Sequence, residues 1–256
     1  MIANYHTHTA RCKHAIGTEE EYVLCAIDAG LEILGFSDHT PYPFRNGYRS
    51  GIRMGVEEFT GYAQTVNKLR AQYADRIQIH LGVEAEYYPQ LFPALLDILQ
   101  EQSTEYLLLG QHFLHNEVDG VYAGAPTDDV HILQQYCDQA IDGLYTGMFS
   151  CFAHPDLIHY IGDNKIYRDH MRRLCRAANA CDVPLEINLL GIQGKRHYPA
   201  DRFWEIAAEE NCTVILGTDA HQPQNLCNVQ ALQTGEELIS RLGISNLETL
   251  SLHAIG

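Results

Sequence analysis

Histidine and acidic residues recur in this sequence just after short apolar segments. The first segment ends in His6-Thr7-His8, where two imidazoles two residues apart on an extended chain point to the same side. The other candidates follow later segments or the loop after the first: His14, His39, Glu84, His112, His154, Asp219 and His221. One such histidine is usually a hydrogen-bonded loop residue, but six segments that end alike predict a shared site. Mixed imidazole and carboxylate groups suit zinc, manganese or iron better than magnesium or calcium.

These residues need a fold that brings the ends of many segments together. Seven segments rich in β-branched and aromatic residues alternate with helical patterns, which predicts a parallel sheet with crossover helices. The expected strands are 2–6, 33–37, 77–84, 106–111, 149–153, 185–188 and 213–217, and the expected helices lie near 18–29, 56–74, 90–101, 128–145, 166–181, 200–210 and 232–242. Because the carboxyl ends of parallel strands share one side of a barrel, the polar segment ends are expected at one barrel mouth.

The domain organisation follows from the length of the chain. The 256 residues contain no Pro- or Gly-rich linker, which favours one α/β barrel domain over residues 1–256. An open doubly wound sheet is the alternative topology. The glycine-rich motif with which such a sheet binds nucleotides does not follow the first segment. We therefore expect a barrel with seven strand–helix repeats.

The charge and the cysteines of the chain indicate which kinds of partner and which cellular environment to expect. The formal net charge is −16 and no run of Lys or Arg is present, which argues against binding to a nucleic-acid backbone. No apolar run of about eighteen residues and no signal-peptide pattern occur, so we expect a cytoplasmic protein that does not bind membranes. The eight scattered cysteines favour reduced thiols. Among them, Cys12 lies between His8 and His14, where it could reach a metal.

Six motifs, in order along the chain, resemble those of the PHP (polymerase and histidinol phosphatase) family, and within it those of the histidinol-phosphate phosphatases. The motifs are YHTHTARCKHA, GFSDHTPYPF, LGVEAEYYP, GQHFL, AHPDLI and GTDAH. The resemblance implies a distorted seven-stranded (β/α)7 barrel of the TIM-like, PHP type with about three divalent ions. It implies three ligand sets: His6, His8, Glu84 and Asp219 for one ion, His14, His39 and His221 for a second, and His112 and His154 for a third, which shares Glu84 with the first.

A centre of this kind is suited to hydrolysis of phosphate esters, because adjacent metals clamp the attacking and leaving oxygens. Asp219 or His221 could also relay protons as catalytic residues. In the resembling phosphatases an arginine in the loop after the sixth strand contacts phosphate, and Arg196 is its best match in the segment from Asn188 onward. We expect Arg196, Arg53, Asn188 and His159 to contact the substrate.

The resemblance implies hydrolysis of L-histidinol phosphate to L-histidinol and phosphate, a step of histidine biosynthesis. Two residues depart from the resembling phosphatases: Gln111 replaces a small residue, and His159 replaces a basic one. Glu86, Glu117 and Asp156 could pair with a substrate ammonium. The alternatives are a PHP phosphoesterase for another small phosphomonoester or a nucleotide end, and a metal-binding barrel without catalysis. No feature of the sequence indicates an oligomeric state.

Overall fold

The computed structural model describes residues 1–45 and 47–255. Its centre is a parallel sheet in which the strands pair in the order of the chain. The seven predicted strands are confirmed as β1 (Ala3–Asn4), β2 (Ile33–His39), β3 (Gln78–Ala85), β4 (Tyr106–Leu109), β5 (Phe149–Phe152), β6 (Leu185–Asn188) and β7 (Thr213–Gly217). An open doubly wound sheet would reverse its strand order part of the way along, so this order supports the barrel.

The sheet of the described residues has an eighth strand, β8 (Ser245–Asn246), where the sequence pattern indicates seven. This strand pairs with the start of β7. Because its two residues are polar and exposed, it lacks the apolar alternation that marks a strand in a sequence. At the opposite ends of the strands, a bridge between Thr7 and Ala220 joins the segments that follow β1 and β7. The sheet therefore curls into a distorted barrel that closes at the carboxyl ends of its strands.

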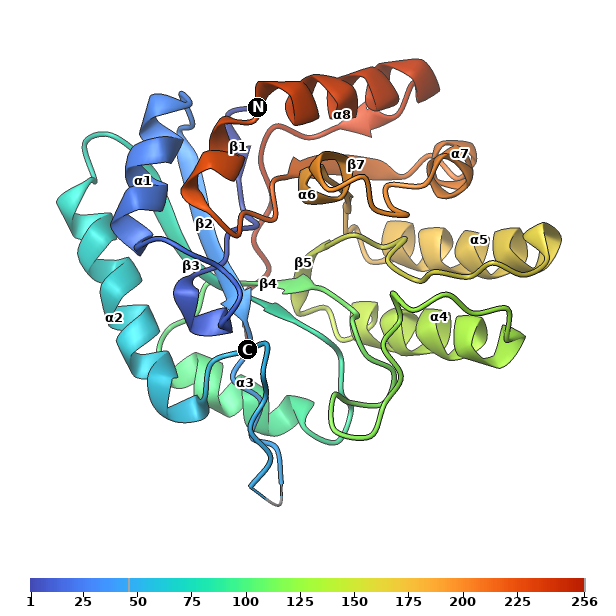
Figure 1. Cartoon of the computed structure of the whole chain (residues 1–256), viewed down its shortest axis with the longest axis horizontal. Coiled ribbons are helices and arrows are strands. Elements are labelled where there is room, and N and C mark those ends of the chain that lie inside the picture. The colour runs from blue at the N-terminus through green and yellow to red at the C-terminus, as the bar shows by residue number, and fades with distance from the viewer. Residues whose placement is uncertain (46, 256) are drawn as a thin grey trace.

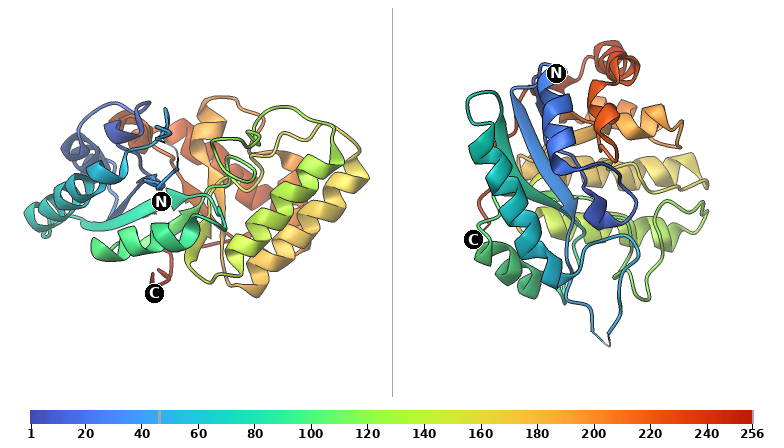
Figure 2. Two further views of the ribbon diagram at one scale, coloured as in Figure 1. Left: turned by 90° about the horizontal axis from the view of Figure 1, so that it is seen from below. Right: turned by 60° about the vertical axis from the view of Figure 1, so that its left-hand side comes forward.

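Helices cover the outside of the curled sheet (Figure 1). The seven predicted helices are confirmed as α1 (Glu19–Asp28), α2 (Val56–Gln72), α3 (Phe92–Glu101), α4 (Val130–Leu144), α5 (Asn164–Ala180), α7 (Asp201–Glu209) and α8 (Val229–Leu242). A short additional helix, α6 (Leu189–Gln193), directly follows β6. Figure 2 shows α4 and α5 side by side on one flank of the molecule. Within the two described ranges, no helix combines the length and the apolar character needed to cross a membrane.

Alternation along the strands separates two hydrophobic cores. On β4, Leu107 and Leu109 belong to the larger core, which contains the buried side chains of the helices. Tyr106 and Leu108 belong to a smaller cluster of side chains from several strands. Successive residues of a strand face opposite sides of a barrel, so the smaller cluster fills its interior. The hydroxyl of Tyr106 donates a hydrogen bond of 2.6 Å to the carbonyl oxygen of Tyr5 inside this cluster. The filled interior supports the mouth from below.

Candidate metal centre

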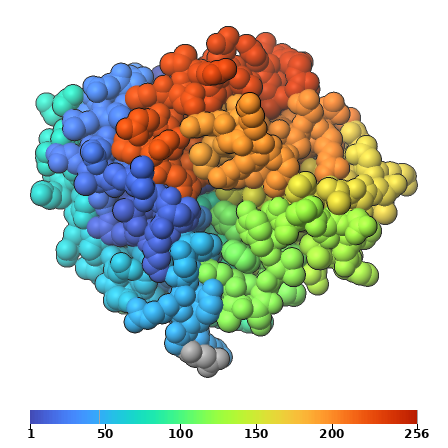
Figure 3. Space-filling model, viewed as in Figure 1, coloured from blue at the N-terminus to red at the C-terminus, as the bar shows by residue number. Residues whose placement is uncertain are grey.

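The nine predicted ligands converge at the carboxyl ends of the strands. Seven of them line one cavity of about 390 Å³: His14, His39, Glu84, His112, His154, Asp219 and His221. The other two, His6 and His8, are buried, and their Nε2 atoms lie 3.1 Å apart. In the space-filling view, the blue N-terminal segment and the orange segment around α6 border a hollow at the centre of this face (Figure 3). The barrel mouth therefore carries the concentration of ligands that the sequence predicts.

Five groups of candidate ligand atoms among the described residues are compact enough to hold a metal ion; one is His8, His39 and Glu84, and three others together contain eight of the nine predicted ligands. In each group the atoms lie within 4.8 Å of one another: His6, His8 and Asp219 in the first, His14, His39 and His221 in the second, and His6, Glu84 and His154 in the third. His112 joins the third group, because its Nε2 lies 3.4 Å from Glu84 Oε1. Cys12 is buried and forms a further group with His8 and His221. The thiol is therefore within reach of the centre.

Glu84, at the end of β3, is the carboxylate that these groups share. Its Oε1 lies 2.9 Å from Nε2 of His154, and its Oε2 lies 3.0 Å from Nδ1 of His39. The register of the sheet explains part of this arrangement, since His39 on β2 pairs directly with Glu84 on β3. Gly110 makes room for the carboxylate, because a Cβ atom there would lie 2.0 Å from Glu84 Oε1. Glu84 therefore lies between His39 at the end of β2 and His154 shortly after β5.

The hydrogen bonding of Glu84 fits a metal ligand. Both of its carboxylate oxygens are buried and accept no well-oriented hydrogen bond from the described residues, although imidazole nitrogens lie close by. The buried Nδ1 of His39 also has no hydrogen-bond partner among these residues. A buried carboxylate without a partner is strongly destabilising, and a cation bound between it and the imidazole lone pairs removes that penalty. The residues present therefore fit a divalent ion.

The electrostatics of the centre favour positive charge. Burial raises the pKa of Glu84, but the opposite effect of His112, His39 and His6 is larger and leaves this pKa well below its usual range. The pKa of Asp219 is also well below its usual range, because the effects of His6 and His221 exceed that of burial. Burial lowers the pKa of His39 to about 3, so this imidazole stays neutral. Ionised carboxylates and a neutral imidazole are the forms that bind metals.

Glu186 on β6 is a functional residue that the sequence interpretation missed. Its Oε2 accepts a hydrogen bond of 2.6 Å from Nδ1 of His6, which directs Nε2 of that imidazole toward the other ligands. Asn188 donates hydrogen bonds from its side-chain amide to Glu186 Oε1 at 2.7 Å and to Asp219 Oδ2 at 3.1 Å. A charged residue inside the short strand Leu185–Asn188, which is buried throughout, was the signal that could have identified it.

Asp38, Cys12 and Asp219 fix the orientation of three further imidazoles. Oδ1 of Asp38 lies 3.4 Å from Nδ1 of His8, and Oδ2 accepts the amide N–H of Thr9. The imidazoles of His14 and His221 donate from Nδ1 to backbone carbonyl oxygens, at 2.7 Å to Cys12 and at 2.9 Å to Asp219. Each contact leaves Nε2 free to bind a metal. The motif GFSDHTPYPF contains Asp38 beside His39, but the sequence does not show that Asp38 contacts His8.

Two of the ligands have a strained backbone. His154 has φ of 33° and Asp219 has φ of 49°, so both occupy the left-handed region that residues with a Cβ atom rarely adopt. Each is the second residue after the end of its strand, β5 or β7. Such strain costs about 1–3 kcal/mol and persists where function requires a particular side-chain direction. At these two positions it turns both ligands toward the cavity, where both are found.

Arg196 lies on the wall of the same cavity, as the sequence predicts. It follows α6, and its guanidinium donates a hydrogen bond to the hydroxyl of Tyr198. Apolar and aromatic side chains form much of the remaining wall: Ile52, Phe113, Tyr122, Leu157, Leu190 and Tyr198. Glu84 and Asp219 are the acidic residues among the described lining side chains. The cavity therefore combines a metal-binding floor, one cation and an aromatic wall.

The other three predicted substrate contacts lie elsewhere. Arg53 is buried, and its guanidinium donates to the carboxylates of Glu86 and Glu117. The side-chain amide of Asn188 donates to Glu186 and Asp219, and its side-chain oxygen caps the N-terminus of α6. The ring of His159 stacks on that of His197, with centroids 4.0 Å apart. These residues do not line the cavity, so their assignment to the substrate does not fit the geometry.

Three acids and one amide from the sequence interpretation also have protein partners. Glu86 and Glu117 bind Arg53, and Oδ2 of Asp156 accepts the amide N–H of Ala200 at 2.6 Å. Burial raises the pKa of Asp156 to about 7. Gln111 is buried and bonds to the backbone of Tyr87 and Phe113. Glu86, Glu117 and Asp156 therefore do not fit the expected role of pairing with a substrate ammonium.

Comparisons with known proteins identify relatives of this chain. A family model described as the PHP domain matches residues 4–189. A protein named probable histidinol-phosphatase from Deinococcus radiodurans is 28% identical to this chain over 239 residues, which cover 87% of each protein. One with the same name from Schizosaccharomyces pombe is 24% identical and covers 88% of this chain and 82% of its own length. Among solved structures, histidinol phosphate phosphatase from Lactococcus lactis, in complex with zinc, L-histidinol and phosphate, is 20% identical with a TM-score of 0.75 and covers 99% of this chain and 97% of its own.

Proposed function

Because the chain belongs to the PHP domain family, we propose that it is a metal-dependent phosphomonoesterase whose substrate is L-histidinol phosphate. The observation that carries the proposal is the convergence of nine imidazole and carboxylate ligands around one cavity with an arginine on its wall. The names of the relatives support the choice of substrate. The products would be L-histidinol and inorganic phosphate, and residues 1–256 would act as one catalytic domain.

The positions of the residues at the barrel mouth suggest a role for each in metal binding, phosphate binding and proton transfer. His6, His8, Glu84 and Asp219 would hold one divalent ion, His14, His39 and His221 a second, and His112 and His154 a third with Glu84. When bound, such ions supply a Lewis-acidic centre that neutralises phosphate and lowers the pKa of an attacking water. Arg196 would hold the phosphate from the wall of the cavity. Asp219 or His221 would relay a proton; His221 could do so only while its Nε2 is not bound to a metal, because its Nδ1 already donates to a backbone carbonyl oxygen.

The organic part of the substrate would lie against the aromatic wall. Phe113, Tyr122 and Tyr198 line the cavity, whereas its two acids, Glu84 and Asp219, belong to the proposed metal centre. Aromatic rings bind a cation over their faces and stack on an imidazole. A phosphomonoester with a cationic, ring-bearing leaving group therefore fits this cavity.

We expect purified protein to contain about three transition-metal ions per chain, of zinc, manganese or iron, because each of the three ligand sets that the resemblance implies could hold one. Elemental analysis after supplementation with each metal in turn measures the number and identity. His131→Ala, at an exposed histidine of α4, controls for adventitious binding and should leave the ratio unchanged. At most one tightly bound ion under all conditions would contradict the trinuclear centre.

We expect kcat/KM for L-histidinol phosphate to exceed that for glycerol phosphate or p-nitrophenyl phosphate by at least about tenfold, the size that one or two pocket contacts supply. Contacts with the ammonium and the imidazole would position the reacting phosphate. A panel of phosphomonoesters that includes phosphotyrosine and a nucleoside monophosphate, assayed with metal-loaded protein, measures this preference. Equal kcat/KM values for all substrates would refute L-histidinol phosphate as the specific substrate but not the phosphatase activity. No hydrolysis of any of them would refute both.

A further inference from the structure

We propose that Arg53 is a positioning residue of the metal centre. Through Glu86 it fixes the orientation and the tautomer of His112. Through Glu117 and Thr40 it also ties together the loops that follow β2, β3 and β4. The inference rests on the proposed metal centre, because His112 is one of its ligands, but it does not depend on the identity of the substrate.

The burial and bonding of Arg53 give it an unusual position for an arginine in a loop. Its side chain is 1% exposed, and that of Glu86 is also 1% exposed. Nη2 donates to Glu86 Oε1 at 2.8 Å, and Nη1 donates to Oε2 at 3.1 Å, which makes a bidentate pair. Nε donates to Glu117 Oε2 at 2.6 Å. A buried guanidinium is stabilising only when such bonds satisfy it, so its place in the structure is tightly determined.

Glu86 transmits this position to a metal ligand. Its Oε1, which accepts from Arg53, lies 3.2 Å from Nδ1 of His112. Both carboxylate oxygens of Glu86 accept hydrogen bonds from the guanidinium of Arg53, so this carboxylate acts as an acceptor on both oxygens. Nδ1 of His112 must therefore carry the hydrogen. Nε2, on the side of Glu84, keeps the lone pair that a metal requires.

Arg53 also connects three neighbouring loops of the mouth. It lies between β2 and α2, and its Nη1 donates to the carbonyl oxygen of Thr40 at 3.3 Å, directly after β2. Glu86 directly follows β3, and Glu117 lies in the segment after β4. Oε1 of Glu117 accepts a hydrogen bond of 2.9 Å from the hydroxyl of Tyr48. One guanidinium therefore links the segments that follow His39, Glu84 and His112.

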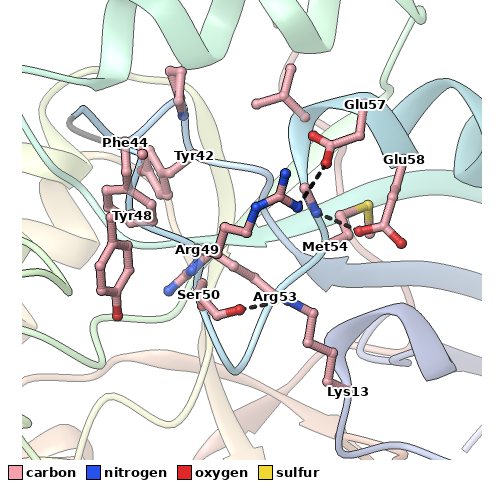
Figure 4. Close-up of a pocket in the computed structure, with 14 residues that line it drawn as sticks. Lys13, Tyr42, Phe44, Tyr48, Arg49, Ser50, Arg53, Met54, Glu57 and Glu58 are labelled. Carbon is pink, nitrogen blue, oxygen red and sulfur yellow. Dashed lines mark hydrogen bonds and ion pairs between the residues drawn. The ribbon is translucent and has the colours of Figure 1, made fainter.

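Aromatic rings shield this network from water on one side. The guanidinium carbon of Arg53 lies 5.6 Å from the ring centroid of Tyr42 and 5.9 Å from that of Phe44. In Figure 4, Tyr42, Phe44 and Tyr48 lie together on one side of the loop, while Arg49 extends to Glu57. Arg49, with a side chain 86% exposed, is thus a neighbouring arginine outside the network. Shielding strengthens the charged hydrogen bonds of Arg53, because water competes for them less.

The test compares metal affinity in purified variants by titration against a competing chelator. Glu86→Gln keeps the size of the side chain but no longer enforces a hydrogen on Nδ1 of His112. We expect about a 10–100-fold loss of affinity for one metal, the usual effect of removing such an orienting group. Arg53→Lys should lose part of the affinity, since an ammonium cannot reproduce the bidentate pair. Arg49→Lys, the matched control, should bind metal like the wild type.

A double-variant cycle separates positioning from general destabilisation. In a His112→Ala background, Glu86→Gln should cause no further loss of metal affinity if it acts through His112. An equal loss in both backgrounds, or wild-type affinity of a folded Glu86→Gln protein, would overturn the inference. Absence of metal binding by the wild type would overturn the proposed centre and this inference with it. Thermal unfolding of each metal-free variant identifies which of them are folded.

Discussion

Replacing Glu84 with alanine is expected to lower kcat/KM by at least about 1,000-fold, because the proposed centre would lose the carboxylate shared by two of its ligand sets and Lewis-acid stabilisation is worth several kcal/mol. This carboxylate lies within 3.4 Å of imidazole nitrogens from three strands, those of His39, His112 and His154. The variant should also retain fewer metal ions than the wild type. Steady-state kinetics at saturating metal, with elemental analysis of the same sample, measures both effects.

Two further variants make the Glu84 result specific. Glu84→Gln keeps the volume of the side chain and removes its charge, so it should lose nearly as much activity as the alanine variant. Asp169→Ala removes an acid of α5 whose side chain is 60% exposed, and it should behave like the wild type. Wild-type turnover by Glu84→Ala would show that Glu84 is not a ligand.

Replacing Arg196 with alanine is expected to lower kcat/KM by about 10–1,000-fold, the range for loss of one group that stabilises developing charge. The cavity wall offers phosphate this single arginine among the described lining residues, so no neighbour can replace it. The metal content should not change, because Arg196 belongs to none of the ligand groups. Assay of L-histidinol phosphate hydrolysis, with kcat and KM determined separately, measures the loss.

The neighbouring lysine provides the control for Arg196. Lys195→Ala removes the same charge from the same loop, but Lys195 does not line the cavity of the metal centre. Its kcat/KM should stay close to that of the wild type. If both variants lose activity equally, the loop contributes only a general positive potential and Arg196 does not contact phosphate.

Local pattern in the sequence was sufficient to place the candidate ligands at one barrel mouth and to give the order of the elements. The period of apolar residues marks strands and helices within a few positions, and the ends of parallel strands meet in every barrel. His6, His39 and Glu84 could therefore be assigned to one site without knowledge of their distances. The eighth strand escaped this reasoning because Ser245 and Asn246 carry no apolar signal.

The residues that position the ligands were decided only by the tertiary structure. Glu186 bonds to His6 across 180 residues of chain, and Arg53 bonds to Glu117 across 64. No periodicity encodes such pairs, because they depend on which loops the closed barrel brings together. An arginine near a predicted phosphate site is equally consistent with substrate binding and with a buried ion pair. The burial of Arg53 between two carboxylates distinguishes these roles, and burial is a property of the folded chain.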